Sequence, residues 1–331
     1  MTGKTTTGIS ATATSRTAPS ATPAPATGMQ VRFWGVRGSV TCPGPATLRY
    51  GGNTACLEVR CGDRLIIFDA GSGLRLLGLA LAAGGETAVP ATGRRQPVDA
   101  DIFFSHCHLD HVWGLPFFQP AYEPGARLRL WAGHLLPDLT LGEAIRRLVG
   151  HPLFPGGGDF FRADIGFTDF RCGDTLTPHP GIVLATAPLD HPGGGCGYRL
   201  EYGGASLAYV TDTEHRAGAL DPAVLALAAG VDLFVYDCTY TEAEYAAHAG
   251  RGHSTWQHGV RLAAAAGAKR LAIFHHDPSH DDPTLDRIAR EAEAMRPGTL
   301  VAAEGLTLRL PAAPATRPAE IREDDGTPWL V

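Results

Sequence analysis

The chain has 331 residues, of which 44% are hydrophobic and 19% charged, and its formal net charge is -6. This composition excludes extended disorder throughout and allows one large domain or two smaller ones. The acidic balance argues against a nucleic-acid partner, because proteins that bind phosphate backbones usually carry a basic excess. Seven cysteines without CxxC spacing also argue against a disulfide framework and against a thiolate zinc site.

The two ends of the chain differ in composition from the part between them. Residues 1–28 are almost entirely Thr, Ala, Ser, Pro and Gly, and residues 311–331 are rich in Pro and charge. Neither end has the apolar content to offset the entropy of folding, so we predict two tails around one domain over 29–310. No apolar run is long enough to span a bilayer, and the N-terminus lacks the apolar core of a secretory signal. The chain is therefore expected to be cytoplasmic, without a membrane partner, and a homodimer is compatible with it.

Short apolar runs bounded by Gly, Asp and Pro alternate along the domain with a few helical patterns. The predicted strands cover 31–34, 56–60, 65–68, 102–104, 127–131, 182–185, 197–201, 206–210, 233–236, 271–274 and 307–310. The predicted helices cover 74–83, 139–149, 222–229, 255–266 and 284–295. Many strands with interposed helices predict an α/β fold in which two packed sheets are flanked by helices.

The stretch FFSHCHLDHVWG concentrates potential metal ligands where an apolar strand ends. His106 and His108 lie two residues apart, so in extended chain their side chains point to the same side. Asp110 and His111 follow where the chain begins to turn, which lets them face a second point nearby. Histidine and carboxylate donors without thiolate suit zinc, manganese or iron. The spacing therefore predicts a site for two metals.

Three later segments place further candidates just beyond apolar runs. His191 precedes the Gly-rich turn of DHPGGGCGY, and Asp212 ends the run in LAYVTDTEH. In LAIFHHDP, either His275 or His276 can be the last ligand, and His275 is preferred because it directly follows the apolar run. Ligands grouped at strand ends are typical of sites built from loops on a rigid sheet.

The order FDAGSG, SHCHLDH, DHPGGGCGY, VTDTE, LAIFHHDP resembles the metallo-β-lactamase fold superfamily of metal-dependent hydrolases over residues 29–310. The resemblance implies a four-layer αββα sandwich of two mixed sheets and two divalent metal ions. One ion would be bound by His106, His108 and His191, the other by Asp110, His111 and His275, with Asp212 bridging them. Asp69 resembles an aspartate that orders the ligand loop without binding metal.

The segment RGHSTWQHGV resembles one in ribonuclease Z and its phosphodiesterase relatives, and YDCTY stands where they carry a short acidic motif. The resemblance implies that Asp237 orients His253, which would donate a proton to the leaving oxygen. Asp in place of Glu shortens the reach of this pair. The alternative is that the segment only caps a helix.

The opening FWGVRGSVTCPGPATLRYGGNTACLEV resembles a branch related to phosphoribosyl cyclic phosphate phosphodiesterases. In this segment Arg37, Arg49 and Asn53 are candidate phosphate contacts, with surface salt bridges and turn capping as the alternative.

The predicted function is hydrolysis of a small or cyclic phosphodiester by a metal-bridging hydroxide that Asp110 helps to orient. Zinc is the first choice of metal, with manganese or iron as alternatives. A thioester or lactone hydrolase of the same fold, or a non-catalytic metal-stabilised binding module, is the competing interpretation.

Overall fold

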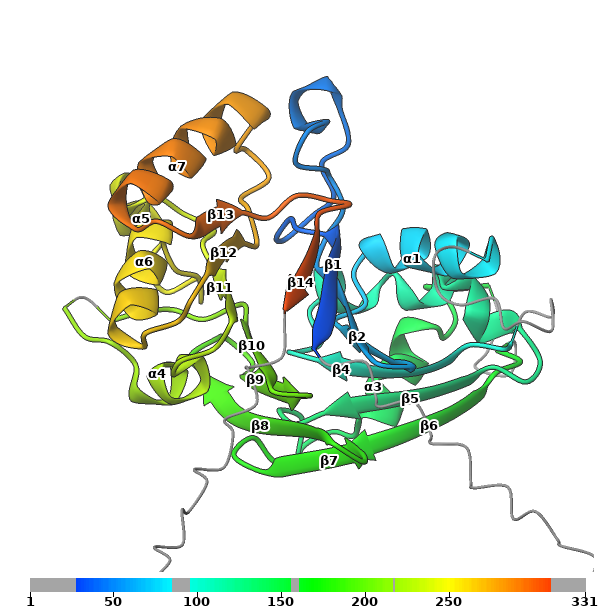
Figure 1. The fold of residues 1–331 in the computed structure, drawn as a ribbon. Coiled ribbons are helices and arrows are strands. Elements are labelled where there is room, and N and C mark those ends of the chain that lie inside the picture. The colour runs from blue at the N-terminus through cyan, green and yellow to red at the C-terminus, as the bar shows by residue number, and fades with distance from the viewer. Residues whose placement is uncertain (1–27, 85–95, 156–160, 217, 311–331) are drawn as a thin grey trace, which may run out of the picture.

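The computed structural model describes residues 28–84, 96–155, 161–216 and 218–310, which form two seven-stranded mixed sheets (Figure 1). Strands of the first sheet are, in spatial order, β14 (Thr307–Leu310), β1 (Met29–Gly35), β2 (Cys56–Cys61), β3 (Arg64–Phe68), β4 (Asp99–Phe104), β5 (Arg127–Ala132) and β6 (Asp164–Asp169). Strands of the second sheet are β13 (Thr299–Val301), β12 (Leu271–Phe274), β11 (Leu233–Asp237), β10 (Ala205–Val210), β9 (Gly195–Tyr202), β8 (Ile182–Leu189) and β7 (Thr175–His179).

The two sheets are built to the same plan. In the first, β14, β1, β2 and β3 pair antiparallel, whereas β3, β4, β5 and β6 pair parallel. In the second, β7 to β10 pair antiparallel and β10 to β13 pair parallel. Parallel neighbours end at the same edge of a sheet, so each sheet presents a row of strand ends to the loops that follow.

Three apolar clusters fill the spaces between four layers. The inner faces of the sheets pack against each other through side chains such as Phe33, Phe68, Tyr198 and Phe274. The outer face of the first sheet is covered by α1 (Gly73–Ala82) and α3 (Leu141–Leu148), beside the short α2 (Leu109–Val112). The outer face of the second sheet is covered by α4 (Pro222–Ala228), α6 (Trp256–Ala265) and α7 (Asp282–Met295), with α5 (Glu242–His248) nearby (Figure 1). Single 3-10 turns are η1 (Pro45–Thr47), η2 (Leu115–Phe117) and η3 (Gln119–Tyr122).

The predicted αββα sandwich is confirmed, and each predicted strand and helix corresponds to an observed one. Sequence patterns missed β6, β7 and β13. The strands β6 and β7 lie at sheet edges and keep no fully buried residue, so they lack an apolar run, and β7 also contains Pro178. Edge strands need bury neither face completely, which removes the alternation on which strand prediction depends.

The predicted N-terminal tail, apart from Gly28, and the predicted C-terminal tail lie outside the described residues, so their disorder and the domain boundaries stay predictions. Among the described helices, none has the length and apolar content that crossing a membrane requires.

A buried carboxylate, that of Asp101, connects β4 and β5 of the first sheet with the edge strand β7 of the second. Asp101 on β4 accepts hydrogen bonds from Arg129 Nε at 2.8 Å and Trp131 Nε1 at 3.0 Å, both on β5. It also contacts His179 Nε2 on β7 at 2.6 Å. Burial would raise the pKa of Asp101, but the hydrogen bonds from Arg129 and His179 outweigh burial and lower the pKa below 3.8.

We expect Asp101→Asn to lower the free energy of unfolding by about 2–3 kcal/mol, because it leaves the Arg129 guanidinium without its buried partner. Since the folded pKa is depressed, this contribution is present above the unfolded-state value of 3.8 and is lost as the pH falls through the folded value. Urea unfolding at pH 7 and at lower pH measures both effects. The matched control is Asp99→Asn on the same strand, whose side chain is 42% exposed and whose loss should cost less than about 1 kcal/mol. Equal losses in the two variants would contradict this account.

Candidate metal centre

The candidate ligands lie at strand ends, and unusual backbone geometry turns several of them inward. Four residues other than glycine have a positive φ in the described part of the chain: Ser39 (61°), Asp69 (60°), Asp212 (54°) and His275 (62°). All four lie at this cluster, and Asp69 and His275 directly follow β3 and β12. Left-handed backbone is costly for residues with a Cβ and is found mainly where the surrounding structure imposes it at functional sites.

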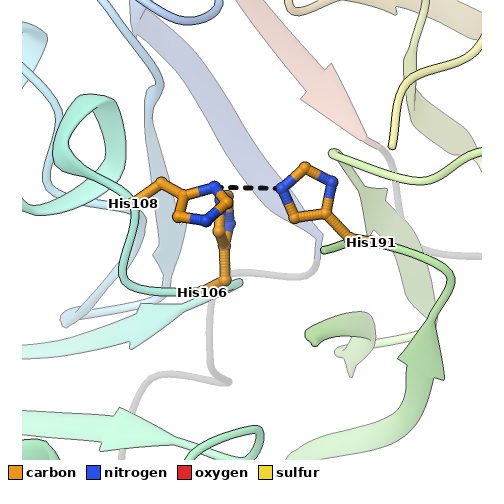
Figure 2. Close-up of side chains that lie close together, drawn as sticks. All are labelled: His106, His108 and His191. Carbon is orange, nitrogen blue, oxygen red and sulfur yellow. Dashed lines mark hydrogen bonds between the residues drawn. The ribbon is translucent and has the colours of Figure 1, made fainter. Parts of the chain in front are cut away.

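A first group of donors consists of His106, His108 and His191 (Figure 2). The first two follow β4 and the third follows β8, so the group is shared by both sheets. His191 Nε2 lies 3.0 Å from His108 Nδ1, and one ring nitrogen from each residue falls within 4.8 Å of the others. His106 and His191 are buried, whereas His108 is exposed. The group is therefore open to solvent on the His108 side.

A second group consists of Asp110, His111, Asp212 and His275. Asp212 Oδ2 lies 3.2 Å from both His111 Nε2 and His275 Nε2. Its other oxygen, Oδ1, lies 3.8 Å from His106 Nε2 and from His191 Nε2. The Asp212 carboxylate thus stands between the two groups, with one oxygen toward each.

Buried hydrogen bonds fix the ring orientation in both groups. His111 Nδ1 donates to Asp69 Oδ2 at 2.8 Å, and His191 Nδ1 donates to the Gly252 carbonyl at 2.8 Å. Each acceptor lacks a hydrogen to give, so Nδ1 carries the proton and Nε2 faces the cluster with its lone pair.

Asp237, at the end of β11, reaches His253 in spite of being shorter than glutamate. Its Oδ2 lies 3.0 Å from His253 Nδ1, and its Oδ1 accepts from Thr239 Oγ1 at 2.7 Å. Thr239 Oγ1 in turn lies 3.0 Å from His275 Nδ1. Burial would lower the pKa of His253, but the Asp237 carboxylate outweighs burial and raises the pKa to about 9. The predicted pairing of Asp237 with His253 is thus present, and it connects to the second group through Thr239.

The structure brings His275 to the cluster and directs its neighbour elsewhere. His275 Nε2 lies 3.4 Å from Asp110 Oδ2, whereas His276 Nε2 donates to the Ala302 carbonyl at 2.8 Å. The two residues directly follow β12, and successive side chains of an extended chain point to opposite sides.

The three candidate phosphate contacts have structural partners. The fully buried Arg37 donates to the carbonyls of Gly51 and His280 at 2.7 and 2.6 Å. Arg49 forms a two-pronged ion pair with Asp286, at 2.8 and 2.6 Å. Asn53 contacts Glu304 through its backbone N–H and its side-chain amide, at 2.6 and 3.0 Å. These contacts match the alternative of salt bridges and turn capping, and a role in substrate binding stays a prediction.

Several side chains that complete the site are not among the residues predicted from the sequence. Ser105 and Tyr209 donate to Asp69, which contacts the candidate ligand His111, and Thr239 Oγ1 lies 3.0 Å from Nδ1 of the candidate ligand His275, but a hydroxyl carries no recognisable spacing signal. His134 was also missed, although it follows β5 closely, and the strand-end rule applied to the other histidines would have found it. Its ring centroid lies 6.5 Å from that of His106, and burial lowers its pKa to about 4.

The family assignment rests on comparison with known proteins. Residues 64–276 match the model of the beta-lactamase superfamily domain, so the chain belongs to this superfamily. It is 30% identical over 252 residues to ribonuclease BN of Citrobacter koseri, covering 61% of this chain and 78% of that protein. It is 30% identical over 138 residues to ribonuclease Z of Parabacteroides distasonis, covering 42% of this chain and only 40% of that protein.

The fold has close structural counterparts. Zn2+-bound PqqB from Methylobacterium extorquens superimposes with a TM-score of 0.63 at 18% identity, over 84% of this chain and 99% of that one. At this identity the likeness concerns the fold alone. The predicted superfamily and the predicted fold are both confirmed.

We expect Tyr209→Phe to lower the free energy of unfolding by about 2 kcal/mol, because the Tyr209 hydroxyl donates to the buried Asp69 carboxylate at 2.8 Å and hydrogen bonds to charged groups are the stronger class. The matched control is Tyr198→Phe, an equally buried tyrosine whose hydroxyl donates to the neutral Phe104 carbonyl at 2.6 Å. Its expected cost is about 1 kcal/mol. Denaturant unfolding compares the two, and a larger loss in the control would contradict the special role of Asp69.

Proposed function

We propose that this chain is a metal-dependent phosphodiesterase whose reaction centre is the His/Asp cluster. The observation that carries the proposal is that two donor groups meet at Asp212 while His253, held by Asp237, stands beside them. Relatives named ribonuclease Z and ribonuclease BN support cleavage of a phosphodiester bond. The acidic net charge argued against a nucleic-acid partner. The names of these relatives argue against excluding RNA as a substrate.

The residues fit a pair of divalent ions. His106 Nε2 is buried and has no hydrogen-bond partner among the described residues, although the ring points into a cluster of donors. A buried, unpaired ring nitrogen in such a place is costly unless an ion occupies the position. In this proposal His106, His108 and His191 hold one ion, Asp110, His111 and His275 hold the other, and Asp212 contacts both. Imidazole and carboxylate donors suit zinc, manganese and iron alike, and zinc is the proposed ion because such sites generally bind it more tightly than divalent manganese or iron.

When bound, such ions supply a nucleophile from water at neutral pH and stabilise the negative charge that develops on the phosphoryl group. Residues of the chain orient the attacking water and supply the proton for the leaving oxygen. The Ser39 backbone N–H donates to Asp110 Oδ2 at 2.7 Å and so fixes the carboxylate that orients the attacking water. His253 is held at Nδ1 by Asp237, which leaves Nε2 to donate a proton to the leaving oxygen.

Protein purified without chelator is expected to contain about two equivalents of divalent metal per chain, measured by inductively coupled plasma mass spectrometry. Asp212→Ala should reduce both equivalents, because its two oxygens face the two donor groups. His276→Ala is the neighbouring control, since its ring donates to the Ala302 carbonyl outside the cluster, and it should retain the metal. Less than about one equivalent in the wild-type protein would contradict a two-metal site.

We expect His253→Ala to lower kcat on aryl phosphodiesters by about 100-fold or more, within the range for loss of a general acid. The loss should be larger for a phenol leaving group than for p-nitrophenol, because the weaker leaving group depends more on protonation. A merely structural role of His253 would affect both leaving groups equally.

The control for this variant is His151→Ala, an exposed histidine outside the cluster, which should retain activity on both leaving groups. Undiminished phosphodiester cleavage by His253→Ala would exclude the proton-donor role. Turnover confined to thioesters or lactones would overturn the proposed function itself.

A further inference from the structure

An apolar rim lies directly beside the proposed reaction centre. Three large apolar side chains of this rim are exposed to solvent: Val40 by 55%, Leu109 by 64% and Trp113 by 47%. Leu109 and Trp113 flank Asp110 in the chain, and Val40 follows Ser39, whose N–H binds the Asp110 carboxylate. Exposed apolar side chains gathered in one place mark a binding surface more often than isolated ones do.

These side chains line a cavity that adjoins the cluster at Asp110. It measures about 140 Å³ and is lined by Val40, Leu109 and Trp113 together with Ser39, Thr41, Thr54 and Asp110. Asp110 is the only ionisable residue among these lining residues. The cavity therefore offers apolar walls to a ligand and meets the donor cluster at a single carboxylate.

The size of the cavity and its aromatic wall define what fits. A cavity of about 150 Å³ with apolar walls accepts a ligand of the size of benzene. Trp113 is steadied by an edge-to-face contact with Phe117, with ring centroids 6.5 Å apart, and an indole face favours an aromatic ligand. A guanidinium or ammonium partner for a second phosphate does not line this cavity.

We propose that this cavity binds a compact, uncharged aromatic group of the substrate, so that the preferred substrate is a phosphodiester with one aryl ester. This inference rests on the proposed phosphodiesterase function. His253, which would protonate the leaving oxygen, does not line the cavity, whereas Asp110 and Ser39 do. The aryl group in the cavity is therefore the ester group that stays on phosphorus, and the leaving group departs on the His253 side.

The test compares two diesters with the same leaving group and charge, phenyl p-nitrophenyl phosphate and methyl p-nitrophenyl phosphate. The wild-type protein is expected to show a kcat/KM about tenfold or more higher for the phenyl ester, the discrimination typical of filling an apolar pocket. Trp113→Ala and Leu109→Ala should each reduce this ratio toward one. Met295→Ala, which removes a side chain 59% exposed at the end of α7, should keep it.

Two further outcomes bear on the occupant of the cavity. A ratio of one in the wild-type protein, or a ratio that survives in both variants, would overturn the proposal. A clear preference for thymidine 5′-p-nitrophenyl phosphate over the phenyl ester would also overturn it, because the group beside Asp110 would then be a nucleoside.

A binding measurement separates this inference from the proposed function. Calorimetry of the metal-loaded protein should give an affinity about tenfold higher for phenylphosphonate than for methylphosphonate, and Trp113→Ala should abolish the difference. If neither diester is hydrolysed, the proposed function fails while the phosphonate comparison still decides the fate of the cavity. Equal affinities, or no binding of either phosphonate, would count against the aromatic subsite.

Discussion

The candidate site depends on one buried carboxylate, that of Asp69. It accepts hydrogen bonds from the Ser105 backbone and hydroxyl at 2.7 and 2.8 Å, from His111 Nδ1 at 2.8 Å, and from the Tyr209 hydroxyl at 2.8 Å. Three of these donors belong to the segment after β4, with His111 in α2, and the fourth crosses from β10 in the other sheet. A fully buried charge is tolerated only when its hydrogen bonds are satisfied, so the same contacts that stabilise Asp69 hold the segment that carries the candidate ligands and connect the two sheets.

The remaining geometry follows from where parallel strands end. Asp69, His106 and His111 come from one sheet, and His191, Asp212, Asp237 and His275 come from the other. Because the sheets face each other, their strand ends converge, and donors far apart in the chain come within a few ångströms. The positive φ of Ser39, Asp69, Asp212 and His275 is the local cost of this convergence, and the packed sheets on both sides keep these residues in place.

Two kinds of surface meet at Asp110. On one side lies a polar cluster of imidazoles and carboxylates, and on the other lies the apolar cavity with Leu109 and Trp113. The segment LDHVW contributes to both, because Leu109 and Trp113 lie four residues apart on one face of the helical turn α2, whereas Asp110 and His111 belong to the cluster. A change in this segment is therefore expected to affect both the donor cluster and the cavity.

The sequence by itself determined the layers of the fold and the position of the His/Asp cluster. Short-range patterns carry that information: apolar runs mark strands, and the spacing of His106, His108, Asp110 and His111 is local. Only the tertiary structure decided what depends on distant partners. It directed His275 rather than His276 to the cluster, it brought Asp237 within 3.0 Å of His253, and it gave Arg37 and Asn53 structural partners. Edge strands, hydroxyl contacts and the cavity at Trp113 also escaped the sequence, because burial and hydrogen bonding arise between segments that no local pattern relates.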